Sequence, residues 1–321
     1  MMSEDTKNID KLKKEVRKKF RKGKFNEARE QKLEIIKELK EADAIGLDIE
    51  KSSSLNNKII MEILGIYFDF LKNRVNSPLL RGVFLHLPNF TTHVNIEIVW
   101  DLLNVLREYV EGEAKRKKLN LSNLITALLC WFQIITVGAG NSFNDVEERD
   151  FTNWLYNVSS LIINEIFTLN IEDMLAFLKT INIALIQKRQ YSSDLITVFI
   201  KRLSMLSLHA PDYFQWGLLL FIKKVINKYP NAKGVIDFNP TGVSEVFSKE
   251  DEQIILNEDP QLLTTTHQLS IYYELVWLMQ SSDNKYITGL VRSILEEKQL
   301  PQDLLNISPL ELTKKMYLSS K

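Results

Sequence analysis

Cysteine is almost missing from this chain of 321 residues: only Cys130 is present, and one thiol cannot build the disulfide framework of a small secreted domain. Glycine and proline are scarce, at 11 and 8 residues, which excludes collagen-like and proline-rich disordered sequences. No apolar run reaches the roughly 18 residues that cross a bilayer, and the first forty residues lack the apolar core of a signal peptide. These absences predict a protein without a membrane partner, in a compartment where the thiol stays reduced.

Patterns that carry catalytic chemistry are missing as well. No grouping of histidine, cysteine and carboxylates has metal-ligand spacing, and the four histidines are scattered: His86, His93, His209 and His267. The segment Gly138-Ala139-Gly140 lacks the third glycine and the Lys-Ser/Thr pair of a phosphate loop, so we interpret it as a turn that ends a helix. Cys130 lies in an apolar run, which predicts a buried, inert thiol. We therefore expect no enzyme activity, no metal and no cofactor.

Charge is balanced in total, with 41 basic and 41 acidic side chains, but it is unevenly distributed. The stretch from Lys11 to Arg29 holds ten Lys or Arg against two Glu, whereas Glu245–Pro260 has a net charge of −5. A basic arm of this kind favours binding to the phosphates of RNA or DNA, with salt-sensitive and sequence-independent affinity. A solubilising or nuclear-import tail is the alternative. The candidate phosphate-binding residues are Lys13, Lys14, Arg17, Lys18, Lys19, Arg21, Lys22 and Lys24.

Helical periodicity runs through nearly the whole sequence. Strong helix formers dominate residues 7–44, so residues 1–50 are predicted to be a charged helical arm. Beyond it, apolar residues recur at a period of 3.6, most sharply at Val99, Leu102, Leu103 and Leu106. No stretch alternates convincingly at period two. The predicted helices cover residues 59–71, 95–111, 121–137, 145–168, 171–188, 193–208, 212–228, 263–281, 284–297 and 309–319.

Short breaks rich in Pro, Asn and Gly separate these helices, which indicates antiparallel neighbours. We predict an all-α fold, an irregular HEAT-like α-solenoid of about ten helices with a long charged N-terminal helix. The arm would occupy residues 1–50 and the solenoid residues 51–321, with an acidic loop at 237–260. A globular helical bundle is the competing interpretation. We expect four tryptophans in the core rather than at an interface: Trp100, Trp154, Trp216 and Trp277.

Several segments carry a resemblance to a known family. They include Ile66–Asn73, Ser77–Leu80, Asn89–Asn95, Asp101–Leu106, Phe199–Leu203 and Lys228-Tyr229-Pro230. Together they resemble the nucleolar complex protein 3 family, of the CCAAT-binding factor domain type, with the CCAAT-binding factor-like part at about 190–321. The resemblance implies a short, compacted member, in which Ser282–Tyr286 replaces the family's His-Tyr-His-Pro turn. It also implies signature residues with structural or partner-binding roles: Tyr67, Pro78, Asn95, Lys201, Arg202, Pro230, Asp259, Pro260, Tyr273 and Glu274.

The function that this resemblance implies is non-catalytic. It is a factor of the nucleus and nucleolus for large ribosomal subunit biogenesis, acting in pre-rRNA processing and in intranuclear pre-ribosome maturation and transport. The implied partners are nucleolar complex protein 2, pre-ribosomal particles of the large subunit and precursor rRNA. The alternative is a chromatin-bound factor in the initiation of DNA replication.

Overall fold

The structure is a computed structural model that describes residues 55–114, 120–138, 145–187, 191–236, 270–298, 304 and 306–319. Within these ranges every regular element is a helix, so the predicted all-α, solenoid-like fold is confirmed. The basic arm at 1–50 and the acidic segment at 237–260 lie outside the described residues. The chain divides into two units, Met1–Gly65 and Ile66–Lys321. The described part of the first unit, residues 55–65, is helical throughout.

The second unit is a succession of helices joined by short turns. Seven of the α-helices in the described ranges match the predicted ranges within three residues at each end, and two of them, those at 212–228 and 309–319, match at both ends. The elements are α3 (Leu80–His86), η1 (Leu87–Asn89), η2 (Thr91–His93), α4 (Ile96–Ala114), α5 (Leu121–Gly138), α6 (Asp145–Glu165), α7 (Ile171–Ile181), the π-helical turn η4 (Asn182–Gln187), α8 (Ser193–His209), α9 (Asp212–Lys228), η5 (Pro230–Ile236), α12 (Tyr272–Ser281), α13 (Lys285–Leu295) and α15 (Pro309–Ser319).

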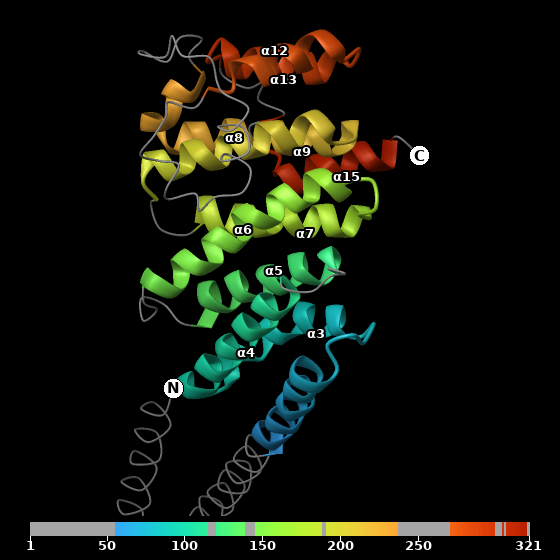
Figure 1. Cartoon of the computed structure of the whole chain (residues 1–321), viewed down its shortest axis with the longest axis vertical. Coiled ribbons are helices and arrows are strands. Elements are labelled where there is room, and N and C mark those ends of the chain that lie inside the picture. Colours follow the sequence, from blue (N-terminus) through green and yellow to red (C-terminus); the bar gives the residue numbers. More distant parts are fainter. Residues whose placement is uncertain are drawn as a thin grey trace, which may run out of the picture. The chain divides into compact units, whose positions relative to one another are not determined.

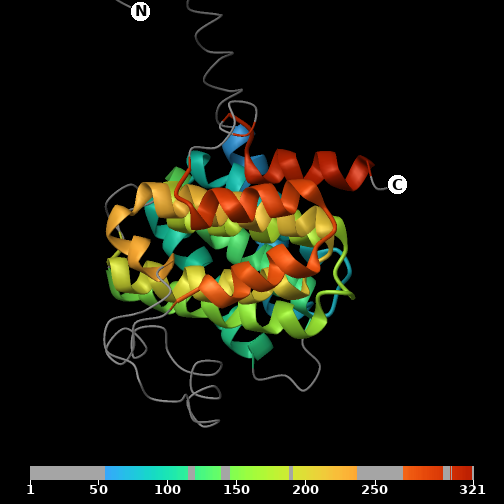
Figure 2. The same cartoon turned by 90° about the horizontal axis from the view of Figure 1, so that it is seen from above.

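Consecutive helices of this unit stack in layers (Figure 1). Helix α5 packs on α3 and α4 and, on its other side, on α6 and α7. Helix α8 then packs on α6, α9 packs on α8, and the α12–α13 pair packs on α8 and α9. Seen from above, the helices of successive layers overlie one another (Figure 2). This is the arrangement of an α-solenoid, in which each helix pair buries its apolar face on its neighbours.

The last helix departs from this order. Helix α15 packs on α9 and α7 rather than on the preceding pair, α12–α13 (Figure 1). At the crossing, a Cβ placed on Gly217 of α9 would lie only 1.9 Å from the Oγ1 of Thr313. Glycine is therefore required for the close approach of α9 and α15. The C-terminal end of the chain thus returns to the middle layers.

The core is deepest at α5 and α9, which are apolar around most of their circumference. A helix of this kind must be covered on several sides, and both contact at least four other elements. Trp216 of α9 is buried, and Trp100 and Trp154 are half-buried. The prediction of a core position is wrong for Trp277, whose surface is 65% exposed. The reason is that α12 buries the stripe formed by Leu275 and Leu278, and Trp277 lies on its other face.

Side-chain caps fix where several helices begin. Asn170, Ser192 and Asn284 each accept a hydrogen bond from a backbone N–H in the first turn of α7, α8 and α13. Ser308 and Glu311 form a reciprocal capping box at the start of α15.

None of the helices in the described ranges has both the length and the apolarity to cross a membrane.

Candidate functional site

Two of the sequence-predicted residues, Lys201 and Glu274, are brought together from positions 73 residues apart. The Nζ of Lys201 on α8 donates to the carboxylate Oε1 of Glu274 on α12, and also to the backbone carbonyl of Ser270 at 2.7 Å. The side chains are only 20% and 11% exposed. Because both charges are largely removed from water, each depends on the other. This pair fastens the last layer, α12–α13, to α8.

Arg202, the next signature residue, is buried in the contact between α8 and α6. Its guanidinium carbon lies 4.3 Å from the centre of the Tyr156 ring, and that ring meets Phe199 edge-to-face with centroids 5.4 Å apart. Burial raises the pKa of Tyr156, and the positive charge of Arg202 opposes this shift. Arg202 therefore attaches α8 to α6, whereas the neighbouring Lys201 attaches α8 to α12.

The other signature residues lie apart from this pair. Tyr67 is half-buried, with its ring edge-to-face on Phe90 at 5.8 Å. Three signature residues are exposed: Pro78 before α3, Asn95 before α4, and Pro230 at the start of η5. The backbone carbonyl of Asn95 accepts hydrogen bonds from N–H groups in the first turn of α4. Tyr273 is 67% exposed. Asp259 and Pro260 lie outside the described residues, as do the eight basic residues predicted in the arm.

Helix α9 carries a set of lysines that bind backbone carbonyls of distant segments. Lys223 donates to the carbonyl of Ser293 at 2.7 Å, and Lys224 donates to that of Ile307 at 2.6 Å. Ser293 lies in the last turn of α13, where carbonyls have no partner within their own helix. Burial lowers the pKa of both lysines, although the carboxylate of Glu297 works in the opposite direction at Lys223.

The motif Lys228-Tyr229-Pro230 makes a similar contact at the end of α9. The Nζ of Lys228 donates to the carbonyls of Ile186 at 2.5 Å and Leu185 at 3.3 Å. The hydroxyl of Tyr229 donates to the same Leu185 carbonyl at 3.0 Å. Both acceptors belong to the π-helical turn η4, whose widened backbone leaves carbonyls to be satisfied from outside. The segment Lys228-Tyr229-Pro230, which carries part of the family resemblance, thus connects the end of α9 to η4.

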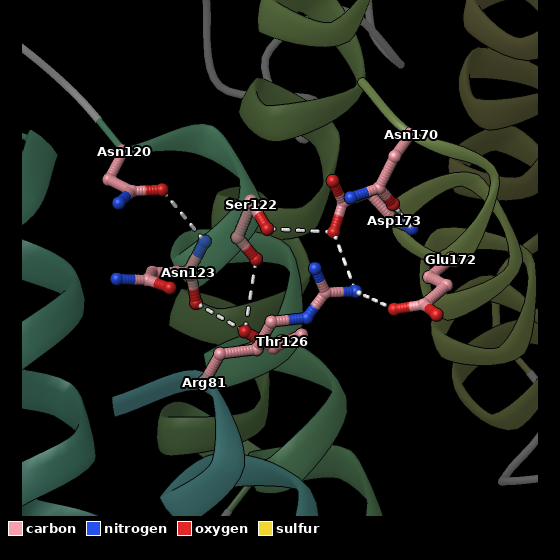
Figure 3. A network of polar contacts seen from close by, with 8 residues as sticks. All are labelled: Arg81, Asn120, Ser122, Asn123, Thr126, Asn170, Glu172 and Asp173. Atoms are coloured by element: carbon pink, nitrogen blue, oxygen red, sulfur yellow. Dashed lines mark hydrogen bonds and ion pairs between the residues drawn. The ribbon is translucent and has the colours of Figure 1, made fainter. Parts of the chain in front are cut away.

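A polar network that the sequence did not reveal joins α3, α5 and α7 (Figure 3). Arg81 of α3 contacts the carboxylate of Asp173 at 2.9 Å and that of Glu172 at 3.3 Å. Ser122 of α5 donates to the same Asp173 carboxylate at 2.7 Å, and the side chain of Asn170 accepts from the Asp173 backbone N–H at 2.9 Å. Asp173 is buried, so its charge needs these donors. The network holds α3 and α5 to α7.

Groups with reactive chemistry are few in the described ranges. Cys130 is fully buried in α5, and burial raises the pKa of its thiol well above the usual range. A thiol in this state is a poor nucleophile. No three His, Cys, Asp or Glu side chains of the described residues converge as metal ligands would. The ionic groups described above instead connect helices of different layers.

Comparison with known proteins decides the family. The model of the CBF/Mak21 family matches residues 124–289, just over half of the chain, from α5 to α13. The chain belongs to the CBF/Mak21 family. The match covers the layers joined by Lys201, Arg202 and Glu274. It begins within α5, and the predicted boundary near residue 190 stays a prediction.

Curated relatives give the same result. The human protein named nucleolar complex protein 3 homolog is 28% identical over 249 residues, which are 76% of this chain and 29% of the human protein. Its namesake from Xenopus laevis is 28% identical over 248 residues, with the same coverage. Nucleolar complex-associated protein 3 of Saccharomyces cerevisiae is 24% identical over 203 residues, 56% of this chain and 30% of the yeast protein. The resemblance to the nucleolar complex protein 3 family is thus confirmed, and the aligned part spans about 30% of the length of these relatives.

Proposed function

We propose that this protein is a non-catalytic assembly factor of the nucleolus that acts in the biogenesis of the large ribosomal subunit. The observation that carries the proposal is the alignment of 76% of the chain with nucleolar complex protein 3 homologs. The layered helices support it, because Lys201, Arg202 and Asp173 are engaged in contacts between layers. A stack of helices of this kind offers extended surfaces for partners.

The finer part of the proposal concerns partners. The protein works as a scaffold together with nucleolar complex protein 2, travels with pre-ribosomal particles and contacts precursor rRNA during its processing. The net charge of +8 between Lys11 and Arg29 supports a phosphate contact made by the arm. Such a contact releases counterions, so its affinity falls steeply with salt.

Affinity purification of the tagged chain at moderate salt, with and without ribonuclease, tests this function. We expect nucleolar complex protein 2 together with precursor rRNA of the large subunit, and accumulation of unprocessed precursors when the chain is depleted from cells. Recovery of replication-origin proteins and DNA, unchanged by ribonuclease and without precursor rRNA, would contradict the proposal. That outcome would favour the alternative, a chromatin-bound factor in the initiation of DNA replication.

Charge reversal in the arm tests the phosphate contact separately. Replacing the eight basic residues from Lys13 to Lys24 by Glu should abolish recovery of rRNA at moderate salt and leave protein partners in place. A control variant outside the arm reverses Lys314 and Lys315, two exposed residues of α15. Equal loss of rRNA in both variants would mean that the arm is not the specific site of the phosphate contact.

A further inference from the structure

Helix α15 packs on two helices that do not depend on it for their own places. Among the described helices, its main contacts are with α9 and α7. Helix α9 also packs on α8 and α13, and α7 also packs on α5. In Figure 1, α15 lies outside the succession of helices that runs from α3 to α13. Loss of α15 would therefore leave the contacts between the remaining layers in place, whereas loss of α5 or α8 would divide the stack.

Few side chains hold α15 in its place. In this helix of 11 residues Pro309, Leu312 and Thr313 are buried, and Leu312 is the one large apolar side chain among the three. Three more side chains are half-buried: Leu310, Met316 and Tyr317. Helix α7 has the same length of 11 residues and buries seven of them. Because buried apolar surface supplies most of the energy that holds a helix on its neighbours, we expect α15 to be held less firmly than α7.

The closest contact of α15 is made by backbone rather than by large side chains. Gly217 of α9 has no side chain at the crossing, and the nearest group of α15, the hydroxyl of Thr313, donates to the carbonyl of Pro309 in the same helix. This hydrogen bond stays intact when α15 moves away. The Nζ of Lys224 on α9 donates to the carbonyl of Ile307 just before α15, but Lys224 is half-buried and its ammonium can bind water instead. Separation at this crossing therefore leaves no buried polar group without a partner.

We propose that α15 is a detachable strap, which leaves α9 and α7 and unfolds while the other helices of the unit keep their places. An isolated helix of 11 residues is unstable in water, so detachment and unfolding of α15 occur together. The capping box of Ser308 and Glu311 lies within the strap and starts the helix again when it docks. The open state uncovers the apolar surface of α9 around Gly217, so the strap controls access to this surface.

Native-state hydrogen exchange of the full chain, measured in low concentrations of urea, tests the proposal. We expect the amides of α15 to exchange about a hundredfold or more faster than those of α7, with rates that hardly change with urea because little surface is exposed by the opening. Helix α7 is the control because it has the same length. Exchange of both helices at the same rate and with the same urea dependence would overturn the proposal. Exchange of α15 without any protection would also overturn it, because the strap would then not be docked.

Labelling of thiols gives a second measurement at the level of side chains. Thr313→Cys places a thiol at a fully buried position of the strap, and the native Cys130 of α5, which is also fully buried, is the control in the same molecule. We expect a thiol reagent to label position 313 about a hundredfold or more faster than position 130 under native conditions. Equal rates at the two positions would overturn the proposal. Hydrogen exchange uses the unsubstituted chain, so the proposal stays testable if this variant does not fold.

Discussion

Replacement of Gly217 by alanine tests the most demanding contact in the fold. The added Cβ would lie 1.9 Å from the Oγ1 of Thr313, 3.0 Å from the Cδ1 of Leu178 and 3.2 Å from the carbonyl oxygen of Pro309. Thr313 and Leu178 are fully buried, and the hydroxyl of Thr313 already donates to Pro309 at 2.9 Å. Because the Thr313 hydroxyl and the Pro309 carbonyl are hydrogen-bonded to each other, neither group can move away alone, and α15 must shift as a whole.

Two opposing terms set the size of the effect. Alanine is about 1 kcal/mol better than glycine in a helix interior. Overpacking of a close contact costs about 1–3 kcal/mol, and the present contact is at the upper end because one atom pair is well inside van der Waals distance. We expect Gly217→Ala to lower the free energy of unfolding by roughly 1–2 kcal/mol.

Urea unfolding and hydrogen exchange of α15 measure this effect. The matched control is Gly289→Ala in α13, where an added Cβ meets nothing within 4 Å, so a small gain in stability is expected. Thr313→Ala removes the nearest obstacle and should restore most of the stability lost in Gly217→Ala. If Gly217→Ala is as stabilising as the control and α15 keeps its exchange protection, the close approach of α9 and α15 is refuted.

Three further predictions concern charged and reactive groups. Lys201→Met leaves the buried Glu274 carboxylate without its cation and should lower the free energy of unfolding in urea by about 2 kcal/mol. Adding Glu274→Leu should recover at least half of this loss. If the losses of stability in the two single variants are additive in the double variant, the ion pair is contradicted. Burial lowers the pKa of Lys223, so the unfolded chain binds more protons between that lowered pKa and the usual value of about 10.4. Stability should therefore rise with pH in this window, and the rise should shrink in Lys223→Met; an unchanged slope would argue against a buried lysine. Cys130 should react with a thiol reagent such as dithiobis-nitrobenzoate only as fast as the chain unfolds, and rapid labelling of the native protein would show that α5 is not covered.

Helix positions could be predicted well because they depend on local pattern. The predicted range 212–228 is that of α9, and 309–319 is that of α15. Apolar residues at a period of 3.6 and the breaks at Pro and Asn are enough to locate such helices. Short elements escaped the prediction, among them α3 and η5, because seven residues contain too few apolar repeats to reveal a period.

Contacts between distant segments could not be predicted from the same pattern. The return of α15 to α9 depends on the absence of one side chain at Gly217, and a single glycine within a helical pattern does not say what approaches it. The carbonyl acceptors of Lys223 and Lys228 are backbone groups, which carry no sequence signal at all. Two lysines, Lys223 and Lys224, interrupt the apolar run Leu218–Ile226, and this interruption is the trace that the contacts of Lys223 and Lys224 leave in the sequence.

The neighbouring signature residues Tyr273 and Glu274 show why a sequence signature does not by itself locate a binding surface. Adjacent residues of an α-helix point about 100° apart, so Glu274 faces Lys201 on α8 while Tyr273 faces solvent. Substitution of Glu274 removes the partner of Lys201 and should loosen the attachment of α12 to α8. Substitution of Tyr273 leaves that ion pair in place. Variants at these two positions should therefore separate loss of the contact between the helices from loss of an exposed side chain.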